Sequence, residues 1–415
     1  MRPLKGGIRL EGKKEATLIP WTALRPDPPK LVRIPLQGRF SCNLFVGKEL
    51  QRTVPDIARS LVQVGDHVKT GEKIAETRAH PSLGIHASLS GKISEISGFI
   101  EILSDGKDET LPPIGKERRG WELLSKVEIF PLLHESGIGL AWRDSVKTVV
   151  LNGCESEPYL TSDYSLMMSH PAEILKAGEI LRRLYQADKL VIALEDNKEE
   201  VAEVFRSKIY FHSLSHARVE VFPARYPQED ERVLVPSLGC KPKETLVLNV
   251  AQAYAVYEAV ALQKPFYERI VTIAGECVAQ PRNFWIRTGT LVKDGVKYAR
   301  GFLREPAKVI LGGPLTGEAI ANLEAPILKE TRGVLGLPPE VAKPETVEPC
   351  IRCGRCVEAC PASISPAMIT LASEKDLFDL AEEYGASYCI ECGNCSYVCP
   401  SKRPMVELIR YVNVR

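Results

Sequence analysis

The sequence lacks three features that would place it in common functional classes. Its longest nearly unbroken apolar stretch, residues 251–262, is too short to span a bilayer and carries Gln252 and Glu258. Its 54 basic and 53 acidic residues leave a net charge of +1, so no bulk field draws it to nucleic acid or anionic lipid. We also expect no signal peptide. The sequence therefore predicts a cytoplasmic protein that meets a membrane, at most on the cytoplasmic face of the inner membrane, through partner proteins.

Cysteine is concentrated near the C-terminus. Eight of the 12 cysteines fall in CIRCGRCVEACP, from Cys350, and CIECGNCSYVCP, from Cys389, which share the spacing C-x2-C-x2-C-x3-C-P. Disulfide frameworks belong to short secreted chains, and zinc sites usually take cysteines in separated pairs. Three thiolates at this spacing wrap one [4Fe-4S] cluster, and the fourth crosses to the other cluster. The sequence therefore predicts two [4Fe-4S] clusters, with Cys350, Cys353, Cys356 and Cys399 as ligands of the first and Cys389, Cys392, Cys395 and Cys360 as ligands of the second.

Glycine, proline and apolar patterns divide the chain into four segments. Residues 1–118 have a proline-rich start and then short β-rich runs with turn glycines, a pattern similar to the barrel-sandwich hammerhead of lipoyl and biotinyl carriers. Residues 119–245 alternate buried strands with amphipathic helices, which is typical of a doubly wound parallel sheet. Residues 246–340 suggest a small mixed sheet, and residues 341–415 a two-cluster ferredoxin-like helical domain. The predicted fold class is a multidomain α/β protein.

Two of these segments lack the residue that a familiar chemistry would need. The hairpin at 78–87, RAHPSLGIHA, has no lysine where carrier domains attach their cofactor, so we interpret the N-terminal module as structural. Its histidines, His80 and His86, are expected at the surface and do not make a metal site. Gly312 and Gly313 precede a proline without the Gly-Lys-Ser/Thr ending of a phosphate loop, which favours a tight turn.

Several longer stretches carry a resemblance to a known family. They are GGIRL at 6–10, VGDHVKTGEKIA at 64–75, NGCESEPYLTSD at 152–163, ALEDNKEEV at 193–201, YPQ at 226–228, GGPLTGEAI at 312–320 and the two cysteine runs. Over nearly the whole chain the sequence resembles the RnfC family, the C subunit of the Rnf complex. The middle more distantly resembles the flavin-carrying subunit of respiratory complex I, including its soluble-ligand-binding β-grasp (SLBB) domain.

The resemblance implies an electron-transfer subunit. Its family members bind FMN and NAD(H) on the α/β domain and pass electrons through two [4Fe-4S] clusters, within a complex that couples ferredoxin oxidation and NAD reduction to ion pumping. On the motifs of this sequence, the resemblance implies a flavin pocket lined by Asn152, Glu155, Glu157 and Tyr159, with Asn197 and Lys198 at the next strand end.

Two loops depart from the family's pattern. Flavin-binding members carry a G-x-G-G-A-G-F-P loop before the first strand, whereas the shortened stretch here keeps Gly137 and Gly139 and continues with Trp142. Members also read YPQGGE, where this chain has Glu229 and Asp230 in place of the glycines. Because those glycines let backbone N–H groups close on a phosphate, both changes argue against FMN and NAD(H) binding.

Three hypotheses follow for the function. The first is an RnfC-like relay through both clusters, with a ferredoxin or flavoprotein on one side and other redox subunits on the other. The second is an FMN-dependent NADH oxidoreductase, in an Rnf complex or as a soluble protein like the cobalamin reductase of propanediol utilisation. The third is a non-redox scaffold with structural clusters. For Glu155 and Glu157, the alternative to flavin contact is that they cap the following helix or pair with Arg143 or Lys147.

Overall fold

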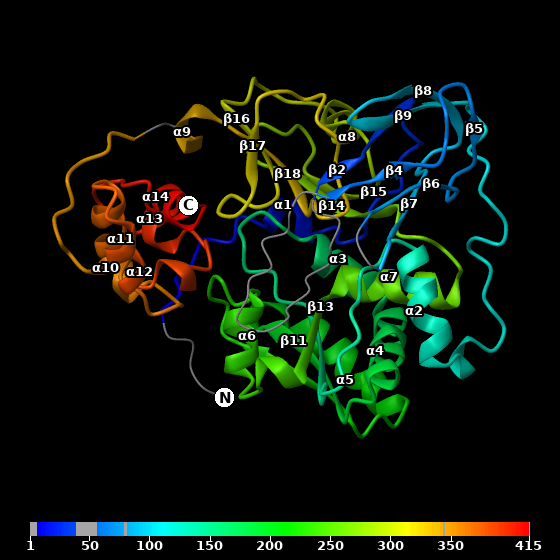
Figure 1. Ribbon diagram of the computed structural model, residues 1–415, viewed down its shortest axis with the longest axis horizontal. Coiled ribbons are helices and arrows are strands. Elements are labelled where there is room, and N and C mark those ends of the chain that lie inside the picture. The colour runs from blue at the N-terminus through cyan, green and yellow to red at the C-terminus, as the bar shows by residue number, and fades with distance from the viewer. Residues whose placement is uncertain (1–5, 39–55, 79–80, 343–344, 415) are drawn as a thin grey trace.

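The computed structural model describes residues 6–38, 56–78, 81–342 and 345–414. Four bodies follow one another along the chain, and Figure 1 shows the C-terminal one set to one side of the other three. No helix within the described ranges has the length and apolar character that a membrane span requires.

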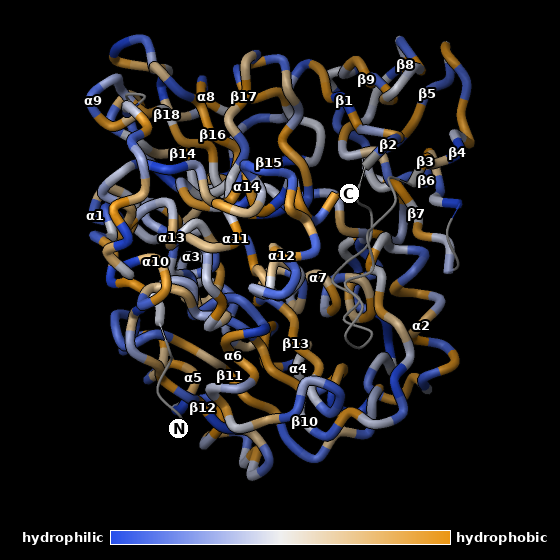
Figure 2. Tube along the Cα trace, turned by 60° about the vertical axis from the view of Figure 1, so that its left-hand side comes forward, coloured by the Kyte–Doolittle hydropathy of each residue, from blue (hydrophilic) through white to orange (hydrophobic). Residues whose placement is uncertain are grey.

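A four-stranded parallel sheet forms the centre of the α/β body. Its order is β12 (Ala217–Phe222), β11 (Lys189–Glu195), β10 (Thr148–Asn152) and β13 (Thr245–Asn249). Leu151 and Ile192 enter the core on one face, whereas Val150 and Val191 enter a second core on the other. The strands are therefore buried on both faces, as the apolar runs of the sequence predict for a parallel sheet. The hydropathy colouring of Figure 2 follows this division, with orange along the strands and blue in the outer turns.

Helices cover both faces of this sheet. The larger core includes residues of α2 (Lys126–Glu135), α3 (Ser162–Ser169), α4 (Pro171–Tyr185), α5 (Glu199–Phe211) and α7 (Val250–Ala261). Leu234 of the short helix α6 (Glu231–Ser237) packs on the opposite face. This is the doubly wound arrangement that the alternation of strands and helices predicted.

The boundary predicted after residue 245 falls inside strand β13. Residues 245–249 pair in parallel with β10, and α7 packs against α4. The apolar helix at 250–261 therefore belongs to the α/β body and not to the segment that follows, because its small and aromatic side chains fill the face above β10.

The N-terminal body is a barrel sandwich of short strands. One sheet has the order β1 (Leu31–Pro35), β9 (Phe99–Ser104), β8 (Gly91–Ile96) and β5 (His67–Val68); the other has β4 (Arg59–Ser60), β6 (Lys73–Glu76) and β7 (Gly84–His86), and β2 (Gln37–Gly38) pairs with β3 (Asp56–Ile57). A short helix, α1 (Glu15–Leu18), precedes these strands. The prediction that His86 is exposed is wrong: it is buried, and burial lowers its pKa to about 3. His80 lies outside the described residues.

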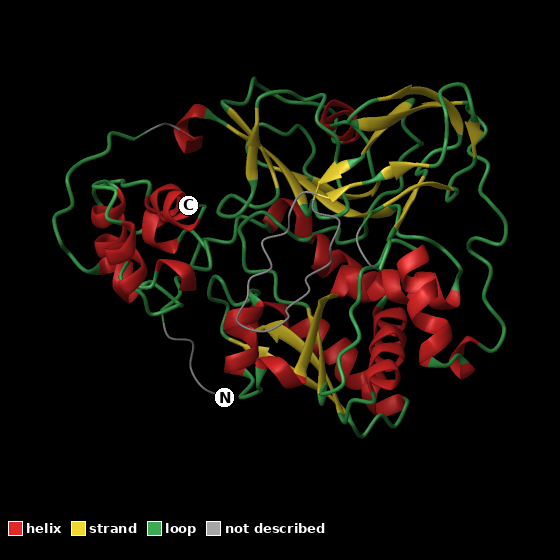
Figure 3. Ribbon diagram, in the orientation of Figure 1, coloured by secondary structure: helices red, strands yellow, loops and turns green. Residues whose placement is uncertain are grey.

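The SLBB body is a five-stranded mixed sheet. Its order is β15 (Arg282–Arg287), β14 (Glu268–Ala274), β18 (Gly333–Leu337), β16 (Lys308–Leu311) and β17 (Glu318–Ile320), with helix α8 (Val292–Tyr298) packed into its core. A last short helix, α9 (Pro339–Ala342), leads out of it. Figure 3 shows these strands beside those of the barrel sandwich, above the helices of the α/β body.

The C-terminal body repeats one helical unit. The first copy has α10 (Arg355–Glu358) and α11 (Pro366–Ser373), and the second has α13 (Asn394–Tyr397) and α14 (Met405–Asn413), with α12 (Phe378–Glu383) between them. The backbone repeats as well. Gly354 and Gly393 both have a positive φ, and so do Arg352 and Glu391 just before them. The two cysteine runs therefore form ligand loops of the same shape.

Candidate metal centre and the adjoining cavity

A small cavity in the C-terminal body is lined by four cysteines. They are Cys360, Cys389, Cys392 and Cys395, which the sequence assigns to the second cluster. The charges of Cys360, Cys389 and Cys392 each act on the thiol of Cys395, so the four groups are close. Within the described part of the chain, no three His, Cys, Asp or Glu side chains converge tightly enough to hold a single metal ion. Thiols spread around a cavity suit a multi-iron cluster, because each binds a different iron.

The thiols of this cavity fit a cluster in a second respect. Burial raises the pKa of Cys392 and of Cys395 to about 12. Burial also raises the pKa of Cys389, against the nearby charge of Arg232. Thiolates buried in this way need a compensating positive charge, which bound iron supplies. The residues present therefore fit a [4Fe-4S] cluster held by these four sulfurs.

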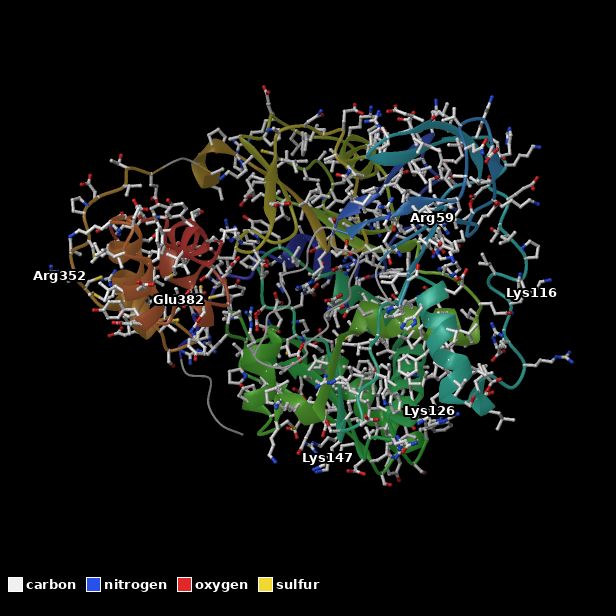
Figure 4. All side chains as sticks on the ribbon, viewed as in Figure 1. Arg59, Lys116, Lys126, Lys147, Arg352 and Glu382 are labelled. Carbon is white, nitrogen blue, oxygen red and sulfur yellow. The ribbon has the colours of Figure 1, made fainter. Side chains whose placement is uncertain are left out.

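The first cysteine run lies in a different environment. Its Cys356 is buried in one apolar cluster with Met405, with the crossing Cys399 and with Cys395 of the second run, and the charge of Cys350 acts on Cys356. In contrast, Cys353 is exposed, whereas its counterpart in the second run, Cys392, is buried. Figure 4 shows Arg352, the residue before Cys353, at the outer edge of the C-terminal body, on the side away from the α/β body. One ligand loop thus faces solvent and the other faces the rest of the protein.

A cavity of about 670 Å³ opens between the second ligand loop and the α/β body. It lies at the carboxyl ends of β10 and β13, where open parallel sheets bind ligands. Residues from all four bodies line it, among them Gly84, Gly137, Asn152, Asn249, Gln252, Arg269, Arg332 and Cys389. The cavity therefore joins the sheet's ligand side to a cysteine of the second cluster.

Glu155 is fully buried and is committed to the start of a helix. Its carboxylate accepts the backbone N–H groups of Asp163 (3.0 Å) and Tyr164 (3.3 Å) in the first turn of α3. This is the helix-capping alternative, since neither Arg143 nor Lys147 contacts it. Arg143 instead donates to the carbonyl of Thr245, and Lys147 pairs with Glu244. The backbone carbonyl of Glu155 accepts the ammonium of Lys14, whose pKa burial lowers to about 8.

Glu157 reaches the Gly-Gly-Pro turn of the SLBB body. Its carboxylate accepts the N–H of Leu315 at 2.9 Å and the N–H and hydroxyl of Thr316. The carboxylate lies so close to Gly313 that a β-carbon there would be 2.0 Å from Oε2. The turn therefore binds an anion, as a phosphate loop does, but the anion is a side chain of this protein.

The other residues of the implied flavin pocket also have partners within the protein. The hydroxyl of Tyr159 donates to Glu276 at 2.8 Å, and the ammonium of Lys198 donates to Glu195 at 2.6 Å. Burial alone would raise the pKa of Glu195, but Lys198 and Lys14 hold it below its usual range. Asn152 lines the cavity and donates to the carbonyl of Glu229 at 2.8 Å. Of the five predicted residues, Asn152 is the one that the cavity's lining includes.

The loops that depart from the family's pattern do not reproduce a phosphate cradle. The N–H of Ser156, just beyond β10, donates to the carboxylate of Glu229 at 2.8 Å. Gly137 lies against the barrel sandwich, where a β-carbon would be 2.5 Å from the carbonyl oxygen of Gly84. The residues around the cavity therefore do not fit the phosphate of FMN in the family's manner.

Trp142, in the first of these loops, packs against other aromatic side chains of the α/β body. Its indole ring stacks on Tyr185 (ring centroids 6.0 Å apart, planes 10° apart) and meets Phe130 edge-on. Tyr185 ends α4, which runs back from the carboxyl end of β10 to the amino ends of the strands. Trp142 therefore packs away from the cavity, and the change in this loop that bears on phosphate binding is the loss of the glycines.

Sequence reasoning missed the two arginines that organise the cavity. Arg332 lies 3.2 Å from Glu229 and 3.2 Å from Asp163. Arg269, which is 8% exposed, lies 3.8 Å from Asp163 and donates to the carbonyl of Lys329 at 2.7 Å. Both come from the SLBB segment, so no local motif joins them to the carboxylates. Two other residues of the cavity lining, Asn249 and Gln252, could have been placed from the sequence. An Asn with a Gln three residues later is the pattern of a capping box, and this one begins α7.

Four family models match the chain. They are the RnfC barrel sandwich hybrid domain over residues 3–109, the Nuo51 FMN-binding domain over 137–258, the SLBB domain over 270–319 and the 4Fe-4S dicluster domain over 344–400. Together with the cysteine-lined cavity, they define a multidomain iron–sulfur electron-transport protein with two [4Fe-4S] clusters.

Curated relatives narrow this class to one family. The chain is 34% identical to the C subunit of the proton-translocating ferredoxin:NAD(+) oxidoreductase complex of Clostridium ljungdahlii, over 99% of this chain and 93% of that protein. It is 32% identical to the C subunit of the Na(+)-translocating complex of Acetobacterium woodii, over 98% and 95%, and 31% identical to the C subunit of the ion-translocating oxidoreductase complex of Rhodobacter capsulatus, over 88% and 73%. This chain belongs to the RnfC family.

A solved structure gives a more distant likeness. An NAD+-reducing [NiFe]-hydrogenase in the air-oxidized state aligns with 64% of this chain and 57% of its own, at 18% identity and a TM-score of 0.44. That likeness adds nothing to the assignment.

Proposed function

We propose that this chain is an electron-transfer subunit of an Rnf-type complex and relays electrons through two [4Fe-4S] clusters. The cavity lined by Cys360, Cys389, Cys392 and Cys395 carries this proposal, because it gathers the three thiols of one run and the crossing thiol of the other. Each cluster, when bound, accepts and releases one electron. The fold of the protein positions the cysteine sulfurs. It buries the second ligand loop and leaves the first exposed.

The two environments give the relay a direction in space. The second ligand loop adjoins the cavity of the α/β body, whereas the first exposes Cys353 and Arg352 at the outer edge of the molecule. We propose that the other redox subunits of the complex exchange electrons at one of these ends, and a ferredoxin or flavoprotein at the other. Contact with a membrane, at its cytoplasmic face, is made through those subunits.

An FMN-dependent NADH oxidoreductase is the second candidate. The match to an FMN-binding domain model and the cavity beside Cys389 favour it. The internal pairing of Glu229, Glu157 and Glu155 speaks against it, because these carboxylates accept backbone N–H groups just beyond β10, in the Gly-Gly-Pro turn and at the start of α3.

Cofactor analysis of protein purified without oxygen tests both candidates. Iron, acid-labile sulfide and flavin are measured per chain in one sample, and NADH is then added while the cluster absorbance is followed. The relay predicts about eight irons and eight sulfides, no flavin and no bleaching by NADH. Stoichiometric FMN with bleaching by NADH would instead establish the second candidate. Fewer than about four irons would contradict both.

A further inference from the structure

The second ligand loop is held by hydrogen bonds from the α/β body. The hydroxyl of Tyr226 donates to the carbonyl of Cys392 at 2.6 Å, and the guanidinium of Arg232 donates to the carbonyl of Ile390 at 3.1 Å. In return, the amide of Asn394 donates to the carbonyl of Tyr226 at 3.4 Å. Three contacts therefore join residues 226–232 to the five residues that contain Cys392.

Arg232 is fixed in place by its neighbour Asp230. The guanidinium makes a two-pronged contact with this carboxylate, Nε to Oδ1 at 2.9 Å and Nη2 to Oδ2 at 2.7 Å. Asp230 also accepts the N–H of Arg232 and so caps helix α6. A two-pronged pair restricts both side chains, so the charge of Arg232 stays at one position beside the ligand loop.

The first ligand loop is more exposed, although the buried Arg403, which pairs with Glu374 at 2.7 Å, lines a cavity beside Cys350. Ile351, the counterpart of Ile390, is 67% exposed, and Cys353 is exposed where Cys392 is buried. Two loops of the same backbone shape thus differ in what surrounds them. A fixed charge acts strongly beside the buried loop and weakly beside the exposed one, because water screens it there.

We infer that Tyr226 and Arg232 are positioning residues for the second cluster, and that Arg232 raises its reduction potential. The inference rests on the proposed function, since it requires that the second cluster be bound. Reduction adds one electron, and hence one negative charge, to the cluster. A nearby cation stabilises that added charge, whereas Asp230 opposes it. The segment at 226–232, which departs from the family's YPQGGE pattern, thus docks the second cluster.

A redox titration of the full chain, purified without oxygen and reduced with dithionite, tests this inference. Arg232→Gln removes the cation, so the wave of one cluster is expected to move to lower potential, with about tenfold less of that cluster reduced at a fixed potential. Asp230→Asn keeps an oxygen to cap α6 but removes the anion, so the same wave is expected to move to higher potential. Arg232→Lys keeps the positive charge, so its wave is expected to lie close to that of the wild type.

Arg206→Gln, at an exposed ion pair on α5, is the matched control and is expected to move neither wave.

The docking role has a separate readout. Tyr226→Phe keeps the ring and removes the hydroxyl that donates to Cys392, so iron is expected to leave to a chelator several-fold faster, with the potentials little changed. The inference about Arg232 is overturned if Arg232→Gln and Asp230→Asn retain full iron and move neither wave, or move both waves equally. A wild-type chain without iron would overturn the proposed function instead, so the two failures are distinguishable.

Discussion

The carboxylate of Glu229 lies 3.2 Å from the guanidinium of Arg332, in a cavity where the family's pattern has a glycine. Arg332 also lies 3.2 Å from Asp163, which is buried. One arginine of the SLBB body thus balances acidic groups from two segments of the α/β body. The two bodies are therefore joined by charge at this cavity.

Replacement of Arg332 by methionine should therefore destabilise the protein. Met fills a similar volume but removes the cation that pairs with both Asp163 and Glu229, and breaking such a pair from one side costs about 3 kcal/mol. The free energy of unfolding, measured in guanidinium chloride with iron retained, is expected to fall by about that amount. Arg304→Met, at an exposed pair with Glu340, is the control and should change little. A loss no larger than that of the control would mean that Arg332 does not join the two bodies.

The sequence predicted the fold better than it predicted the roles of polar residues. Strands β10 to β12 and helices α4 and α5 were readable because their apolar periods are strong and local. The partners of Glu157 and Glu229 were not readable, since Leu315, Thr316 and Arg332 lie in another body. The capping alternative for Glu155 was available from the sequence, because an acidic residue near a helix start is a local feature.

Replacement of each crossing cysteine by serine tests which cysteines bind which cluster. Cys360→Ser should remove the second cluster and Cys399→Ser the first, so each variant should lose about four of about eight irons. Electron paramagnetic resonance of the reduced variants should then show one isolated cluster each, with different spectra. Cys154→Ser, a buried thiol of the α/β body, is the control and should keep all its iron. Loss of the same cluster in both variants would contradict the crossing.

The carboxyl of Glu231 makes the free energy of unfolding depend on pH. It lines the cavity, and burial raises its pKa to about 7, against the charge of Arg143. In the unfolded chain a glutamate titrates near 4.3, so between about pH 4.3 and 7 the folded state binds more protons and stability falls as the pH rises. Glu231→Gln should remove this contribution. The midpoint of thermal unfolding should therefore fall less between pH 5.5 and 8 in the variant than in the wild type.

The control for this experiment is Glu203→Gln, an exposed residue of α5. Its unfolding midpoint should follow the wild-type pH curve. If Glu231→Gln follows that curve too, the carboxyl of Glu231 is not partly buried in solution as the structure has it.

The N-terminal glycines show why some motifs acquire a role only in three dimensions. GGIRL is a recognisable stretch with no chemistry of its own, and it lies more than 340 residues before the nearest cysteine ligand. In the structure the N–H of Gly7 donates to the carbonyl of Ala359 at 3.0 Å, and Ile8 pairs with Tyr226. Gly7 and Ile8 therefore contact the crossing cysteine's loop and the segment that docks the second cluster.

Gly6 is the position where this contact admits no side chain. Its φ is +68°, and a β-carbon would be 2.5 Å from the carbonyl oxygen of Cys360. Gly6→Ala should thus strain the backbone by about 1–2 kcal/mol and push the N-terminal segment away from the loop. We expect faster loss of iron to a chelator in this variant, from the second cluster first. Gly98→Ala is the matched control, because a β-carbon there meets nothing within 4 Å. Equal rates in the two variants would mean that the N-terminal segment does not support the cluster, and the contact of Gly6 with Cys360 would then be packing without a role in iron retention.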